Sequence, residues 1–104
     1  METLFIKHGR DWLNEIDSPD TGSVQWSVEA VKYNSDIRPD ICASISIRDC
    51  SRKVELDFSC HNEKSFKEKM NKLKLLISHL EEMKESLEKS YALCKDEWEK
   101  ISED

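Results

Sequence analysis

The sequence contains neither glycine nor proline from Asn62 to Ile101. Because these two residues interrupt helices most strongly, the stretch predicts one long helix over residues 62–102, with Asn62 as its N-terminal cap. Such a helix would be about 60 Å long, whereas a strand of about nine residues covers about 30 Å. About half of the helix therefore needs a partner other than the chain's own sheet.

Apolar residues recur in this stretch with a seven-residue repeat. With Phe66 at position d, ten of the eleven a and d positions are apolar, which is typical of a helix that pairs with another helix. Lys84 is the one charged residue among them. The d positions are Phe66, Leu73, Leu80, Leu87, Cys94 and Ile101, and the a positions are Met70, Ile77, Lys84, Tyr91 and Trp98.

The apolar stripe changes width along the predicted helix. Leu76 and Met83 broaden it up to Met83, and beyond Lys84 it narrows to positions a and d alone. We expect the first half to cover the sheet and the second half to join two chains as a homodimer. A break near residues 84–90 with a folded-back helical hairpin is the alternative within one chain. The expected interface comprises Leu87, Tyr91, Cys94, Trp98 and Ile101.

Three stretches upstream alternate apolar and polar residues with period two, which predicts strands with one buried face. They cover residues 24–33, 41–48 and 53–61, and short connections with turn-forming residues favour an antiparallel meander. The expected core comprises Trp26, Val28, Ile45, Ile47, Leu56, Phe58, Phe66, Leu73, Ile77 and Leu80.

The first residues have helical spacing of apolar side chains over residues 3–17, although Gly9 weakens a helix there. A short strand at residues 4–7 is the rival interpretation. The sequence thus predicts one α+β domain over residues 1–104 with the element order α-β-β-β-α: an N-terminal helix and sheet in residues 1–61, then the long helix in residues 62–102.

The net charge of −6 makes nucleic acid an unfavourable partner, because phosphates repel an acidic surface. A protein partner fits better, and the candidate acidic surface comprises Asp11, Glu15, Asp17, Asp20, Glu81, Glu85 and Glu88. No apolar run approaches the roughly 18 residues that a membrane span requires, and no signal peptide is recognisable at the start of the sequence. We therefore expect a cytoplasmic protein with reduced cysteines and no membrane partner.

Catalytic, cofactor and metal sites are not expected. The four cysteines and three histidines show no spacing typical of metal ligands, and adjacent residues such as Cys60 and His61 point to opposite faces of a strand. Cys60 beside His79 is the most conceivable nucleophile and base, but His79 lies off the apolar stripe. With Gly9 and Gly22 as its two glycines, the chain has no phosphate-binding loop.

The order of elements resembles that of several groups of small acidic bacterial or phage proteins, including secretion chaperones and immunity-type inhibitors. The absence of catalytic constellations, the acidic surface and the small size predict a non-catalytic inhibitor or escort of a protein partner, for example a phage-encoded inhibitor of a host nuclease or defence complex whose carboxylates stand in for phosphates. The alternative is a structural or assembly subunit whose long helix serves oligomerisation.

Overall fold

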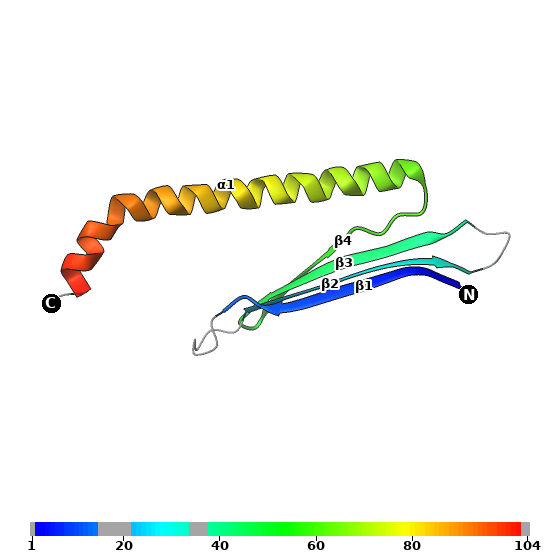
Figure 1. Ribbon diagram of the computed structural model, residues 1–104, viewed down its shortest axis with the longest axis horizontal. Helices are drawn as coiled ribbons and strands as arrows, with labels where there is room; N and C mark the ends of the chain where they lie inside the picture. The colour runs from blue at the N-terminus through cyan, green and yellow to red at the C-terminus, as the bar shows by residue number, and fades with distance from the viewer. Residues whose placement is uncertain (1, 15–21, 34–37, 103–104) are drawn as a thin grey trace. The chain divides into compact units, whose positions relative to one another are not determined.

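The structure is a computed structural model that describes residues 2–14, 22–33 and 38–102. Four strands precede one helix (Figure 1): β1 (Glu2–Trp12), β2 (Gly22–Lys32), β3 (Asp40–Asp49), β4 (Arg52–Asp57) and α1 (Glu63–Ser102). The chain forms two compact units, Met1–Asn71 and Lys72–Asp104. The predicted α+β class, with an antiparallel sheet and a long C-terminal helix, is confirmed.

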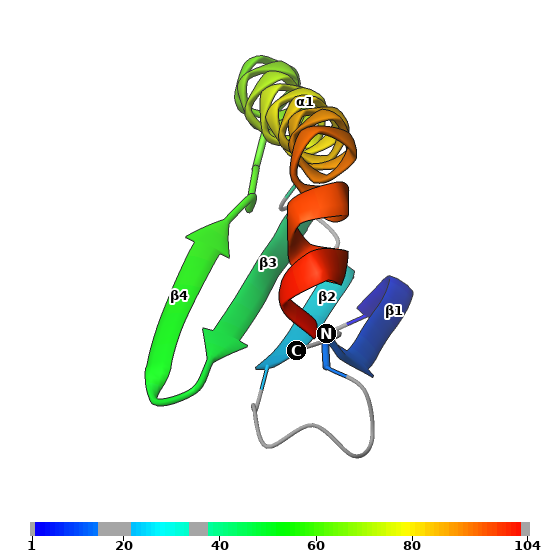
Figure 2. The ribbon, with the colours of Figure 1, turned by 90° about the vertical axis from the view of Figure 1, so that its left-hand side faces the viewer.

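The sheet is a meander in which each strand pairs with the next one in the chain. Its order is β1-β2-β3-β4, and all three pairings are antiparallel (Figure 2). Short connections allow this arrangement, because antiparallel neighbours need no crossover. The sheet has four strands, so the prediction of three was wrong.

The predicted N-terminal helix was also wrong, because Glu2–Trp12 forms strand β1. Residues 2–12 pair with β2 along the edge that does not face β3, and their backbone groups form hydrogen bonds with the N–H and C=O groups of that edge. The pairing places Gly9 opposite Trp26, and a Cβ atom built on Gly9 would lie 2.6 Å from Cε2 of the Trp26 indole. A glycine that disfavours a helix therefore has a cross-strand role here, since it makes room for the indole.

The cross-strand register aligns residues of the predicted apolar set with one another. One cross-strand row aligns Trp26 with Ile45 and Leu56. The neighbouring row aligns Gln25 with Ser46 and Glu55, on the opposite face because side chains alternate along a strand. One face of the sheet is thus apolar and the other polar.

Strand β4 ends earlier than the predicted range 53–61. The hydroxyl of Ser59 accepts a hydrogen bond of 3.0 Å from the backbone N–H of Ala43, in place of a ladder carbonyl. The next residue, Cys60, resumes the pairing with backbone hydrogen bonds of 2.8 and 2.9 Å to Ile41. The Ser59 hydroxyl thus takes the place of a backbone carbonyl as the acceptor for Ala43. After Cys60 the chain leaves the sheet, directly before α1.

The core is much smaller than predicted. Val31 and Cys60 are the buried apolar residues of the described chain, at 2% and 6% exposure. The predicted core residues on the strands are half-buried. Of those on α1, Leu73 is half-buried, and Phe66, Ile77 and Leu80 are exposed. The physical reason is that a single sheet buries its apolar face only against a second layer. Among the described residues of the unit Met1–Asn71, the first turns of α1 are the only helical part.

Helix α1 begins with the predicted cap. The side-chain oxygen of Asn62 accepts a hydrogen bond of 2.8 Å from the N–H of Ser65, and the Ser65 hydroxyl accepts one of 3.1 Å from the N–H of Asn62. This reciprocal pair satisfies backbone groups that the first turn leaves open. From Glu63 the helix continues to Ser102 without a break, so no helical hairpin forms at residues 84–90. In Figure 1 its ribbon bends within the last turns, coloured orange to red.

Candidate protein-binding face of the helix

The apolar residues predicted as an interface in the C-terminal half of α1 lie on one helical face. Leu87, Tyr91 and Trp98 are 63%, 54% and 57% exposed, and Cys94 is half-buried. We call these four residues the seam. The side chain of Ile101, the fifth predicted interface residue, lies outside the described part of the structure. Full burial of a large apolar side chain yields about 1.5–3 kcal/mol, so the seam holds a substantial unused driving force for association.

Two aromatic rings of the seam contact each other. The ring centroids of Tyr91 and Trp98 are 6.1 Å apart, with an angle of 52° between the ring planes. These residues are seven positions apart and therefore occupy successive a positions on the same face. Cys94 lies on the turn between them. The contact places the side chains of Tyr91 and Trp98 next to each other on one face of α1.

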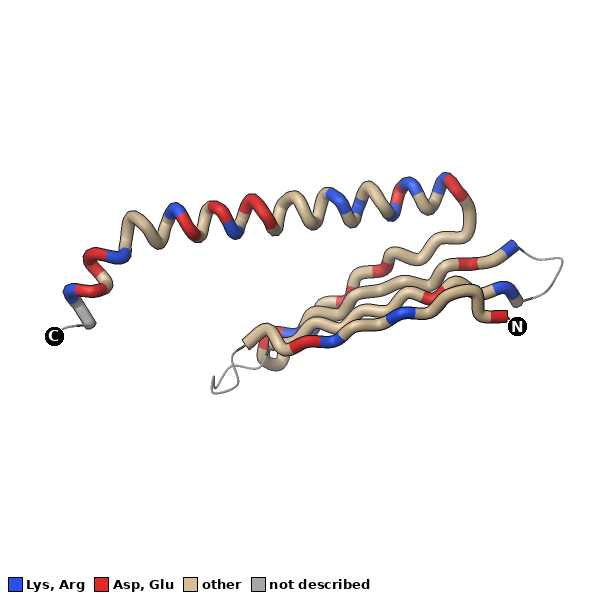
Figure 3. Tube along the Cα trace, in the orientation of Figure 1, with Lys and Arg blue, Asp and Glu red and all other residues tan. Residues whose placement is uncertain are grey.

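Ionic side chains flank the seam. Nζ of Lys84 lies 4.0 Å from Oε1 of Glu88, and Nζ of Lys100 lies 3.6 Å from Oε1 of Glu97. All four side chains are largely exposed, so each pair contributes at most a few tenths of a kcal/mol to the isolated helix. Figure 3 shows acidic and basic residues alternating along this part of α1.

The predicted acidic surface is placed only in part. Glu81, Glu85 and Glu88 are exposed on α1. Asp11 is exposed on β1, where its Oδ1 accepts a hydrogen bond of 2.9 Å from the N–H of Trp12. Glu15, Asp17 and Asp20 lie outside the described residues. The structure therefore places Glu81, Glu85 and Glu88 along one element, α1.

Two hollows on the sheet unit escaped prediction, because they depend on cross-strand register. A polar hollow of about 430 Å³ is lined by His8, Gln25, Trp26, Ser27, Ser44, Ser46, Lys53 and Glu55. An apolar hollow of about 310 Å³ is lined by Leu4, Ala30, Pro39, Ile41, Cys60, His61, Asn62, Glu63 and Phe66. The polar residues that alternate with apolar ones along the strands, such as Gln25, Ser46 and Glu55, could have indicated the polar hollow from the sequence.

Titratable side chains do not gather into a metal site within residues 2–14, 22–33 and 38–102: no group of three or more His, Cys, Asp or Glu side chains is placed to hold an ion. The four cysteines are free thiols. Among the described residues, α1 contains no segment that is both long and apolar enough to span a bilayer.

Comparison with protein-family models, curated proteins and solved structures finds no match to the chain.

Proposed function

We propose that the chain is a non-catalytic protein-binding module that assembles through the C-terminal half of α1, with a second copy of itself as its first partner. The observation that carries the proposal is the exposed apolar seam on an uninterrupted helix. Exposed apolar surface of this kind is typical of an interaction site. Seven-residue spacing is the pattern that one helix offers to another.

Leucines on and off the seam provide a matched test. Leu87 is at position d and 63% exposed, whereas Leu93 lies outside positions a and d and is 84% exposed. We expect Leu87→Ala to weaken self-association about a thousandfold, because about 2 kcal/mol of apolar burial is lost from each of the two helices and every 1.4 kcal/mol is about a factor of ten. Leu93→Ala, which removes the same atoms from the same helix, should leave association unchanged.

Sedimentation and light scattering of the full chain measure this association. A mass of about twice 12.2 kDa at micromolar concentration supports the proposal. A mass of 12.2 kDa at every accessible concentration contradicts self-assembly. Equal association of the two leucine variants would show that the seam is not the contact surface.

An inhibitor or escort of a different protein is the second candidate. The exposure of Glu81, Glu85 and Glu88 along α1 favours it, because clustered carboxylates suit a basic partner. Reversing Glu81 and Glu85 to lysine should abolish capture of such a partner from the native host while the self-association measured by sedimentation persists. If capture is unaffected by this double reversal, the acidic surface is not the binding site.

A further inference from the structure

We infer that the two copies pair antiparallel through the seam, with the twofold axis between Tyr91 and Cys94, so that Glu88 of each copy faces Lys95 of the other. The inference rests on the proposed self-assembly and adds the direction and register of the partner helix. It uses the seam and the charged positions directly beside it.

Side-chain size and charge disfavour a parallel pair. Parallel helices bring each a position against its own copy, so Lys84 would face Lys84, and Trp98 would face Trp98. Two ammonium groups in one core layer repel each other, and equal indoles compete for the same space. The flanking e and g positions of a parallel pair offer no attraction here, because Glu88 would face Met83 and Lys95 would face Ser90.

Antiparallel helices instead bring each a position against a d position. With the axis between Tyr91 and Cys94, the large phenol faces the small thiol in two symmetric layers, and Leu87 faces Trp98 in the layers outside them. Large residues then meet smaller ones, which is the condition for a well-filled core. Lys84 moves to the end of the overlap, where its ammonium group can reach water while its aliphatic stem packs.

Flanking charges, together with the position of Lys84, favour this register among the antiparallel ones. In an antiparallel pair the e positions of the two helices face each other, and Glu88 and Lys95 are successive e positions of the C-terminal half. The chosen register makes two Glu88–Lys95 pairs across the interface. A shift by one heptad in one direction brings Glu88 against its own copy at the axis; this register would pair Glu81 with Lys95, but it also moves Lys84 into a core layer opposite Cys94. A shift in the other direction brings Lys95 against its own copy. Both alternatives place like charges together, which costs free energy.

Charge reversal of the full chain tests the arrangement. Glu88→Lys and Lys95→Glu each replace two attractive pairs by two repulsive ones, so each variant should self-associate about tenfold more weakly or worse. An equimolar mixture should form a heterodimer of wild-type strength, because every facing pair is again of opposite charge. Native mass spectrometry resolves the heterodimer by its mass, and sedimentation gives its dissociation constant.

Glu85→Lys and Lys89→Glu are the matched controls, because these exposed residues on the same helix point away from the seam. They should associate like the unchanged chain, both alone and mixed. Circular dichroism of each variant shows that the helix is retained.

Disulfide trapping gives an independent readout. In a chain with serine at Cys42 and Cys50, the paired changes Glu88→Cys and Lys95→Cys leave the seam intact and should cross-link position 88 of one copy to position 95 of the other. Peptide mapping that finds 88 joined to 88 or 95 joined to 95, or variants without preference for the mixed dimer, would overturn the antiparallel register while leaving self-assembly in place. A monomeric unchanged chain would overturn both proposals.

Discussion

Replacing Gly9 by alanine tests the contact that explains why residues 2–12 form a strand. The added Cβ atom would lie 2.6 Å from Cε2 and 2.9 Å from Cζ2 of Trp26. Ordinary carbon contacts are about 3.5–4.0 Å. The indole must therefore move by about 1 Å, or strand β1 must separate from β2.

The expected cost follows from two opposing effects. Overpacking of this kind costs about 1–3 kcal/mol, and alanine in place of a strand glycine regains about 0.5–1 kcal/mol of backbone entropy. We expect a net loss of about 1–2 kcal/mol in the free energy of unfolding. For a chain of this size, each kcal/mol lowers the melting temperature by about 4–8 °C.

Urea denaturation followed by tryptophan fluorescence measures the loss, at one fixed protein concentration because self-association also stabilises the folded state. Trp26→Phe provides the control, since the single phenyl ring is smaller than the indole and removes the edge with Nε1, Cε2 and Cζ2 that the added Cβ atom would meet. In that background Gly9→Ala should be neutral or stabilising, which gives a coupling free energy of about 1–2 kcal/mol in the double-mutant cycle. An equal cost of Gly9→Ala in both backgrounds would refute the reasoning.

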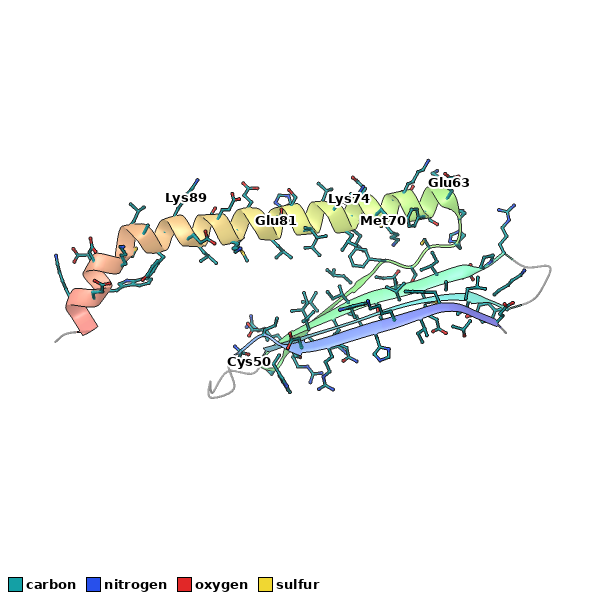
Figure 4. The ribbon with its side chains drawn as sticks, viewed as in Figure 1. Cys50, Glu63, Met70, Lys74, Glu81 and Lys89 are labelled. Carbon is teal, nitrogen blue, oxygen red and sulfur yellow. The ribbon has the colours of Figure 1, made fainter. Side chains whose placement is uncertain are left out.

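Three further predictions concern the helix and the turns. Trp98→Glu should produce a monomer of 12.2 kDa by light scattering whose strand signal in circular dichroism is unchanged, because a carboxylate cannot be buried unpaired in the seam; a variant that remains dimeric contradicts the interface. Cys50→Gly should raise the free energy of unfolding by about 1 kcal/mol in chemical denaturation, since Cys50 at the β3–β4 turn (Figure 4) has a φ of 55°, a region that glycine tolerates better; the control Ser51→Gly should not stabilise. Asn62→Ala should cost about 1 kcal/mol and speed amide exchange in the first turn of α1, because the cap is lost; unchanged exchange at Ser65 would contradict this.

The sequence alone determined the features that rest on local periodicity. The absence of glycine and proline after Asn62 was sufficient to predict the continuous helix α1, since helical hydrogen bonds form within the segment itself. Period-two alternation likewise predicted which face of β2, β3 and β4 is apolar, because side chains alternate along any strand. The residues of the seam follow from the same reasoning, and the contact between Tyr91 and Trp98 agrees with it.

The tertiary structure decided the features that depend on a neighbouring segment of the chain: the strand β1, the end of β4 and the size of the core. Residues 2–12 have an ambiguous pattern, and they become a strand because β2 supplies both the hydrogen bonds and the indole of Trp26 that Gly9 accommodates. Strand β4 ends at Asp57 because the hydroxyl of Ser59 takes the ladder position opposite Ala43, which no local pattern reveals. The small core has the same origin: alternation shows which side chains face one way, but burial requires a second layer.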